Sequence, residues 1–529
     1  MALSLCICIR SVIVLRAKTE VSVGNETELK FHVFPKNLTR LKAARALRRS
    51  DDKPAKEEHL VSVYFDTGKH KLRRKGFSLR VRHSGDKRLQ TIKTEGSAPL
   101  RRGEWEHMIH GDTPDFRVAR GTPLAPLLTK TLKRTLKPIF ATHVHRITVP
   151  LRENSSRIDM ALDEGQIRAG QKSAPFCEVE LELKRGKRTD LFKLARVIGE
   201  LVPAKLALQS KSARGYDLTG DKPGRAGQGQ KIMLQRGTTL ADAFHIIGGS
   251  VLRQLVTNDT AERTLDPEGV HQMRVGLRRL RAAISVFSRF LGDHQTERIK
   301  GEIKWLTGKL GPARDLDVYM KTKIKPLRGA APAKRGLREL AGELAGRRTA
   351  AFEKAKDAVD SPRYRSLMLN TLQWIEARDW ASRARGDRRV KQFAEDILTR
   401  RTNKAMKKGD KLQELDARQR HKLRIAIKKL SYSCDFFESL FADRKTKKRL
   451  SSFKNRLTAI QDCLGALNDI AVHQKLATKF ATGDAPGKRR ARAFAAGVVS
   501  GREQSEIEPL LKAAAKATRK FAHARPFWT

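Results

Sequence analysis

Residues 178–184 read Glu-Val-Glu-Leu-Glu-Leu-Lys, so charged and apolar side chains alternate without interruption. Because successive side chains of a β-strand point to opposite faces, this pattern predicts a strand with three carboxylates and an ammonium on one face. Residues 26–30, Glu-Thr-Glu-Leu-Lys, repeat the pattern near the N-terminus. Carboxylates that share one face repel each other unless something cationic lies among them. The two segments therefore predict a charged sheet face that gathers cations.

The composition indicates a multidomain protein with a polyanionic partner. The chain has 529 residues, of which 110 are Lys or Arg and 57 are Asp or Glu, giving a net charge of +53. Chains of this length usually form two or more domains. Such a charge favours nucleic acid, a phosphate polymer or an anionic membrane surface. Because residues 1–220 carry +20 and residues 221–529 carry +33, a single basic tail is not the source.

Two features bear on the cellular location. The five cysteines are few, scattered and without zinc-ligand spacing, which is typical of a reducing, cytoplasmic compartment. Residues 1–15 are apolar apart from Arg10, but they are too short to span a bilayer and lack a basic start and a clear cleavage site. We therefore expect residues 1–19 to be an N-terminal extension or part of a first strand rather than a signal peptide, and we expect no membrane span.

The chain divides by pattern into a strand half and a helical half. Residues 20–218 are rich in short β-type segments separated by turn signals. The Gly-rich composition of residues 219–238 predicts a flexible linker. Residues 239–525 have helical periodicity almost throughout. The predicted strands are 26–30, 61–65, 78–82, 89–93, 104–106, 142–151, 158–163 and 178–184, with helices near 39–50, 123–135 and 190–201.

The basic strands follow the same alternation as the acidic ones. Arg80 and Arg82 share one strand face, as do Glu104 and Glu106. An open antiparallel sheet with one solvated face could pair such charges across strands. The grouping of acids in some strands and bases in others favours a closed antiparallel barrel with the charged face inside and filled with water. There, clustered Lys and Arg can bind phosphates, and clustered carboxylates can bind hard divalent cations.

The ordered set of these segments resembles the CYTH family, the triphosphate tunnel metalloenzymes, over roughly residues 20–218. The family's Glu-x-Glu-x-Lys strand is present as Glu26-Thr-Glu28-Leu-Lys30. The other matching segments are Val63–Thr67, Leu79–Arg82, Thr91–Lys93, Arg102–Glu106, Glu178–Lys184 and Ser210–Tyr216. The resemblance implies a β-barrel that forms a tunnel, binds a triphosphate and hydrolyses it with Mg²⁺ or Mn²⁺.

The resemblance also implies roles for individual residues. The catalytic residues would be Glu26, Glu28, Lys30 and Glu180, and the metal ligands would be Glu26, Glu28, Glu178, Glu180 and Glu182. The residues that bind phosphate oxygens would be Arg80, Arg82, Lys93, Lys184, Lys211 and Arg214. Asp163 stands where the family tends to keep an acid. Cys177 is expected to be a small packing residue, because no His is placed to activate its thiol.

The helical half contains an internal repeat, with copies at about 239–325 and 390–480. Residues 271–280 match residues 421–430, and residues 310–318 match residues 464–472. Similar order and nearly equal offsets predict two copies of one helical bundle.

Each copy carries a basic stripe, since residues three and four apart lie on one helix face. The first stripe consists of His271, Arg274, Arg278 and Arg281, and the second of His421, Arg424 and Lys428. A solvated helix face would explain one stripe. Its repetition, with a His at the same place in both copies, favours a continuous basic groove.

These helices resemble the CHAD domain, a helical module found beside CYTH domains, over roughly residues 239–525. Gly311-Pro-Ala-Arg314-Asp315 and Gly465-Ala-Leu-Asn468-Asp469 support the match. The family's association with inorganic polyphosphate implies the binding residues His271, Arg274, Arg278, Arg281, His421, Arg424, Lys428 and Lys429. Because Asn468 replaces the Arg314 of the first copy, the two binding surfaces need not be equivalent.

The favoured function is metal-dependent hydrolysis of inorganic triphosphate to diphosphate and phosphate, with inorganic polyphosphate bound by the helical half. One alternative is a nucleoside triphosphatase or a class IV-type adenylate cyclase, against which the low aromatic content of 6% counts weakly. Another is a non-enzymatic polyphosphate- or nucleic-acid-binding protein, but the acidic motifs are intact and no standard nucleic-acid reading motif is present. The expected location is the cytoplasm, where association with polyphosphate granules is one option.

Overall fold

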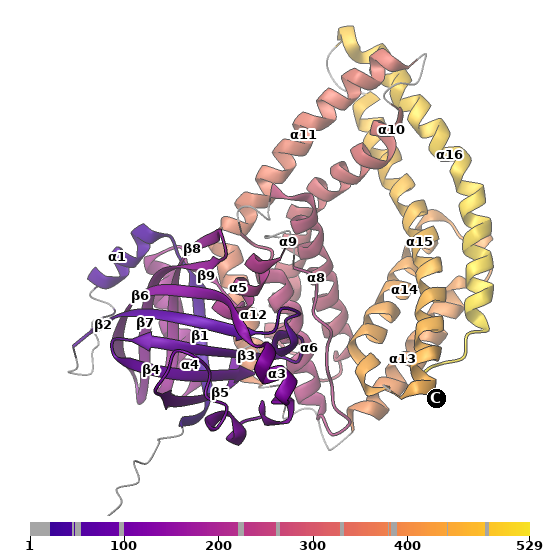
Figure 1. Ribbon diagram of the computed structural model, residues 1–529. Coiled ribbons are helices and arrows are strands. Elements are labelled where there is room, and N and C mark those ends of the chain that lie inside the picture. Colours follow the sequence, from indigo (N-terminus) through magenta and orange to yellow (C-terminus); the bar gives the residue numbers. More distant parts are fainter. Residues whose placement is uncertain are drawn as a thin grey trace, which may run out of the picture.

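The computed structural model describes residues 22–44, 47, 54–94, 100–220, 227–260, 265–327, 333–378, 380–381, 389–441, 443–481 and 486–529. The expectation for residues 1–19 lies outside this part of the chain. The described elements fall into a strand half, followed along the sequence by a helical half (Figure 1).

The strand half is one antiparallel sheet that closes on itself. Its strands are β1 (Ser22–His32), β2 (Lys56–Asp66), β3 (Phe77–Ser84), β4 (Lys87–Thr94), β5 (Arg101–Ile109), β6 (Lys137–Glu153), β7 (Ser156–Ala169), β8 (Lys172–Arg185) and β9 (Lys205–Leu206). The order is β5-β4-β3-β2-β6-β7-β8-β1-β9, and β1 also pairs with β5. That last pairing joins the two sides of the sheet, so the predicted closed barrel is confirmed.

The alternating pattern of β1 and β8 sets which side chains face inward. Leu29, Val179 and Leu181 are fully buried on the outer face, in a core that includes Leu191 and Ile198 of α4 (Arg188–Leu201). The charged residues between them therefore point into the barrel. Other short elements around the sheet are α1 (Pro35–Ala43), α2 (Lys71–Arg74), α3 (Lys130–Thr135) and α5 (Lys211–Thr219).

The helical half is built from long, mostly antiparallel helices. They are α6 (Leu240–Val256), α8 (Pro267–Val286), α9 (His294–Tyr319), α10 (Lys325–Leu327), α11 (Lys334–Asp360), α12 (Pro362–Ala377), α13 (Val390–Gly409), α14 (Ala417–Phe437), α15 (Arg444–Ala481) and α16 (Pro486–Ala522). The repeated motifs occupy equivalent elements, α8 and α9 in the first copy and α14 and α15 in the second. Helices α8 and α14 contact each other, as do α11 and α16. Among the described helices, none combines the length and apolar character needed to cross a membrane.

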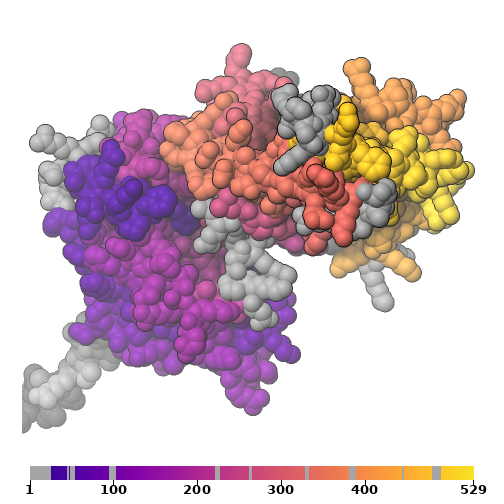
Figure 2. Space-filling view, turned by 90° about the horizontal axis from the view of Figure 1, so that it is seen from above, coloured from indigo at the N-terminus to yellow at the C-terminus, as the bar shows by residue number. Residues whose placement is uncertain are grey.

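The two halves share a continuous apolar core. Helix α12 packs against α4 and β9, and the same cluster of buried residues extends from the sheet into the helices. Polar contacts reinforce this interface: Lys205 Nζ lies 2.6 Å from Asp360 Oδ1, and Arg188 lies 3.4 Å from Glu376. Figure 2 shows the strand half in direct contact with the first helices, while the yellow C-terminal helix lies at the far end.

Part of the predicted linker is anchored rather than flexible. Residues 227–234 form neither helix nor strand, yet Ile232 and Leu234 are buried in the core. The Gly227 amide donates to Asn258 Oδ1 at 2.8 Å. A Cβ atom on Gly229 would clash with the Arg279 guanidinium, so a larger residue here would require the Arg279 side chain to move. The composition predicts flexibility because it does not show these tertiary contacts.

Candidate active site in the tunnel

A charged cavity of about 910 Å³ opens into the barrel and extends from it to the first residues of the helical half. Its lining includes side chains from β1, β3, β4, β6, β8 and α5. The charged residues among them that matter for the site are Glu26, Glu28, Lys30, Arg80, Lys93, Arg146, Glu180 and Lys211. Carboxylates and cations from strands far apart in sequence thus meet in one cavity, which suits a substrate that carries negative charge.

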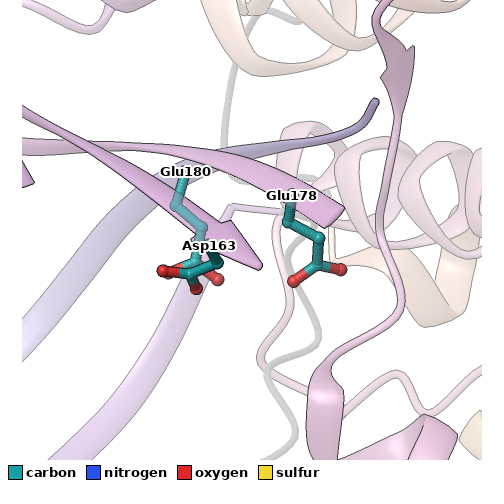
Figure 3. Close-up of side chains that lie close together, drawn as sticks. All are labelled: Asp163, Glu178 and Glu180. Carbon is teal, nitrogen blue, oxygen red and sulfur yellow. The ribbon is translucent and has the colours of Figure 1, made fainter. Parts of the chain in front are cut away.

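One acidic cluster is formed by Asp163 on β7 and by Glu178 and Glu180 on β8. Their carboxylate oxygens lie within 4.8 Å of one another, and all three residues are buried. Figure 3 shows the carboxylates of Asp163 and Glu180 side by side, with Glu178 next to them. Three buried carboxylates at this distance require positive charge nearby.

That positive charge comes mainly from Lys211 at the start of α5. Its ammonium lies 2.8 Å from Asp163, 2.7 Å from Glu178 and 2.7 Å from Glu180. Arg146 adds contacts of 2.6 Å to both Asp163 and Glu180. The cluster is therefore already compensated by side chains, and a metal ion could enter it only by displacing Lys211.

The cations around this cluster lower the pKa of its two glutamates. Burial alone would raise the pKa of the Glu180 carboxyl, but Lys211, Lys30 and Arg146 outweigh burial and hold that pKa well below its usual range. Lys211 and Arg214 lower the pKa of Glu178 against the effect of burial in the same way. Both glutamates are thus ionised and are poor proton acceptors at neutral pH.

A second acidic group consists of Glu26 and Glu28 on β1 and Glu182 on β8, with Glu28 and Glu182 opposite each other in the strand register. Lys30 lies 2.9 Å from Glu28, and Lys184 lies 2.7 Å from Glu182. Burial raises the pKa of the Glu182 carboxyl, and the carboxylates of Glu26 and Glu28 raise it further, although Lys184 opposes them. Because Lys30 also contacts Glu180 at 2.9 Å, this group is less fully compensated by cations than the Lys211 cluster. A hard divalent cation with oxygen ligands fits this group better than the Lys211 cluster.

Cations dominate the opposite wall, on β3 and β4. Arg80 is buried, with its guanidinium 3.7 Å from Glu104 and 3.8 Å from Glu106. Lys93 lies 2.9 Å from Glu26 and 3.0 Å from Glu104. Burial lowers the pKa of the Arg82 guanidinium to about 10, with Arg80 and Arg146 as further causes. A bound phosphate oxygen would relieve this repulsion between cations.

The structure brings most of the residues suggested by the sequence into or next to the cavity. Glu26, Glu28, Lys30, Arg80, Lys93, Glu180 and Lys211 line it directly. Glu178 and Arg214 form an ion pair beside it. Lys184 and Glu182 lie toward the outside, with side chains 46% and 33% exposed. The Cys177 thiol is half-buried, and burial raises its pKa to about 11, so it stays protonated.

Arg146 is the main residue that the sequence reasoning missed. It lies on β6, flanked by His145 and Ile147, and contacts both Asp163 and Glu180. The signal was present, because Thr142, Arg146 and Asp163 all fall on inward-facing positions of adjacent paired strands. A guanidinium in the middle of a strand that alternates in this way is a candidate for the interior.

In the helical half, cations from both repeat copies gather where α8 meets α14. Arg278 donates to the Tyr432 hydroxyl at 3.2 Å. Burial lowers the pKa of the Lys428 ammonium to about 8, and nearby Arg424 and Arg278 contribute. Burial also lowers the pKa of Arg274, with Arg278 among the further causes.

The remaining residues of the two stripes differ in environment. Burial, with Arg314 as the next cause, lowers the pKa of the His271 ring to about 4. His421 is exposed, and its Nδ1 lies 2.9 Å from Asn468 Oδ1. Arg281 and Lys429 are also exposed and near one another, since Arg281 contributes to lowering the pKa of Lys429.

Comparison with known proteins gives the following matches. A family model described as CYTH domain matches residues 24–216, and one described as CHAD domain matches residues 247–478. An inorganic triphosphatase from Haemophilus influenzae is 33% identical over 168 residues, covering 31% of this chain and 46% of that protein. The uncharacterized protein MT2285 from Mycobacterium tuberculosis is 26% identical over 328 residues, covering 58% of this chain and 61% of that protein.

Among solved structures, a CHAD domain from the plant Ricinus communis is 29% identical, with a TM-score of 0.49, covering 56% of this chain and 97% of that one. The chain matches only about half of the length of the triphosphatase and about three fifths of the mycobacterial protein. Both family matches fall on the halves that the structure separates by secondary structure. The chain therefore contains a CYTH domain at residues 24–216 followed by a CHAD domain at residues 247–478.

Proposed function

We propose that the protein hydrolyses inorganic triphosphate to diphosphate and phosphate in the tunnel, with Mg²⁺ or Mn²⁺ as cofactor. The observation that carries the proposal is the division of the cavity lining, with the carboxylates of Glu26 and Glu28 on β1 and the cations Arg80 and Lys93 on β3 and β4. The similarity to an inorganic triphosphatase over the strand half supports the same reaction class.

In this proposal Glu26, Glu28 and Glu182 hold the metal ion. When bound, the ion neutralises phosphate oxygens and assists departure of the leaving group. Arg80, Arg82 and Lys93 bind the phosphate chain and fix its direction in the tunnel, because phosphoryl transfer depends chiefly on positioning and charge stabilisation. Lys30, Lys211 and Arg214 keep Glu178 and Glu180 ionised and in place.

The direct test is a phosphate-release panel with the full chain. Triphosphate, ATP, thiamine triphosphate and long-chain polyphosphate are each supplied with Mg²⁺ and with Mn²⁺. Triphosphate should give the highest kcat/KM. Faster turnover of ATP would favour the nucleotide-hydrolysing or cyclising alternative instead, and absence of release from every compound would leave a binding protein.

We further propose that the cations at the α8–α14 contact bind inorganic polyphosphate, which would also bring this protein to polyphosphate granules in the cytoplasm. Polyphosphate affinity should fall at least about tenfold in the double variant Arg278→Gln/Lys428→Gln and should fall for the parent as salt rises, since the contacts are ionic. Fluorescence anisotropy with labelled polyphosphate measures this. Arg418→Gln, an exposed arginine on the same helix as Lys428, is the control. Tighter binding of duplex DNA than of polyphosphate at physiological salt would contradict the assignment.

Polyphosphate binding should also weaken between pH 7 and pH 9. The Lys428 pKa of about 8 means that this ammonium loses its proton within that range. The charged form, which attracts the polymer, is present below the pKa and lost above it. Lys428→Arg should remove most of this pH dependence, because arginine stays protonated. An unchanged pH profile in that variant would show that Lys428 does not contact the polymer.

A further inference from the structure

The tunnel cavity does not end at the barrel. It continues to the helical half, where it is lined by Lys231 and Met233 of the anchored segment, by Ser250 and Arg253 of α6 and by Thr257 just after α6. Figure 1 shows α6 beside the end of the barrel near α5 and β3. One end of the candidate active site is therefore completed by residues outside the CYTH domain.

This wall of the cavity is held firmly. Besides the Gly227 contact, the Leu234 amide donates to Ser439 Oγ at 2.8 Å, which fixes the segment to the end of α14. Lys231 Nζ lies 3.1 Å from Glu438, and Arg253 Nη1 lies 3.4 Å from Gln230 Oε1. These contacts place the two cations at the cavity wall, although the Lys231 side chain is 64% exposed.

The chemistry of the wall suits phosphate. Arg253 and Lys231 face the same cavity as Arg73 and Arg74 of the strand half. The Ser250 hydroxyl is buried without a hydrogen-bond partner among the described residues. A hydroxyl donor beside a guanidinium and an ammonium matches an oxygen-rich anion, for which arginine offers bidentate hydrogen bonds.

The volume of the cavity also favours a phosphate chain longer than triphosphate. At about 910 Å³ it lies near the upper end of the range of about 300–1,000 Å³ that is usual for drug-sized ligands. A triphosphate held between Arg80, Lys93 and the β1–β8 carboxylates would fill only the inner part. The outer part, next to α6, leaves room for more of the same linear polymer.

We propose that Lys231, Ser250 and Arg253 form a subsite for the fourth and later phosphates of a linear chain, so that the helical half extends the substrate range of the tunnel to inorganic chains longer than triphosphate. The inference rests on the proposed function, since it assumes that a phosphate chain occupies the tunnel. According to this proposal, residues of the anchored segment 227–234 and of α6 determine part of the selectivity for the length of the phosphate chain.

The test compares triphosphate with tetraphosphate in the full chain. In Lys231→Gln/Arg253→Gln, kcat/KM for tetraphosphate should fall about five- to tenfold through a higher KM, while kcat/KM for triphosphate changes less than twofold. Arg236→Gln is the matched control, because Arg236 is an exposed cation two residues after the anchored segment and does not line the cavity. An equal loss for both substrates, or no loss for tetraphosphate, would overturn the subsite.

A binding measurement separates this inference from the proposed reaction. Calorimetric titration of the parent and the double variant with tetraphosphate and triphosphate, in a Glu28→Gln background, reports affinity without turnover. A selective loss of tetraphosphate affinity supports the subsite even if the parent releases no phosphate, in which case only the proposed reaction fails. Equal affinities of parent and double variant for tetraphosphate would overturn the subsite even if triphosphate hydrolysis is confirmed.

Discussion

Glu28→Gln should lower the rate of phosphate release from triphosphate by at least about a hundredfold, and excess chelator should do the same to the parent protein. Glu28 is buried on β1 opposite Glu182, with its carboxylate 2.9 Å from Lys30. Glutamine keeps the size of the side chain but removes one of the negative charges assigned to the metal ion. Removal of one preorganised electrostatic group from an active site typically costs a factor of about 100–1,000 in kcat.

The control for this prediction is Glu57→Gln on β2, a strand that does not pair with β1. Glu57 lies on β2 with its side chain 63% exposed and paired with His145 on the outer surface. This variant should retain the activity of the parent, and circular dichroism should show the same fold in both variants. Retention of more than about a tenth of the activity in Glu28→Gln, or full activity in chelator, would contradict the metal-binding role.

Lys211→Met should destabilise the strand half by about 3–5 kcal/mol at pH 7. The substitution removes the ammonium that contacts Asp163, Glu178 and Glu180 and leaves three buried carboxylates with too little compensating charge. Breaking a buried ionic network by deleting one partner has a penalty of this size. Denaturant unfolding followed through Trp105, with the other tryptophans replaced, measures the change.

The loss of stability in Lys211→Met should depend on pH. In the parent, the pKa values of Glu178 and Glu180 are lowered by folding, so their contribution to stability is present above about pH 4.5 and is lost as pH falls further. In Lys211→Met the carboxylates can become neutral as the pH falls, so the difference from the parent should shrink between pH 7 and pH 4. Lys36→Met, at an exposed lysine of α1, should show no such loss. A loss below about 1 kcal/mol at pH 7 would contradict the role of Lys211.

The strands could be predicted well from the sequence because the period of two leaves little choice. Once residues 178–184 alternate between acid and aliphatic side chains, only one face can be buried against α4. Closure was harder to predict, because a charged face can also be solvated. It depends on β1 pairing with β5 through Ser22–Thr27 and with β8 through Glu28–His32, and no local pattern encodes that division.

The different environments of the three glutamates on β8 could not be predicted from the sequence. Glu178, Glu180 and Glu182 occupy equivalent alternating positions of one strand. Lys211 nevertheless contacts only the first two, because α5 docks against β6, β7 and β8. The contrast in pKa between Glu180 and Glu182 is a product of that docking. Arg146 was missed for a related reason, since its partners Asp163 and Glu180 come from two other strands.

The continuous apolar core between the sheet and the helices determines how the protein responds when its chain is divided into two fragments. A cut between residues 216 and 247 would respect both family matches, but it would uncover Leu206 and Leu208 on one side and the sheet-facing surface of α12 on the other. Exposed apolar patches of this kind promote aggregation. We therefore expect either half expressed alone to be less soluble than the full chain, because each would expose apolar side chains that the other half covers.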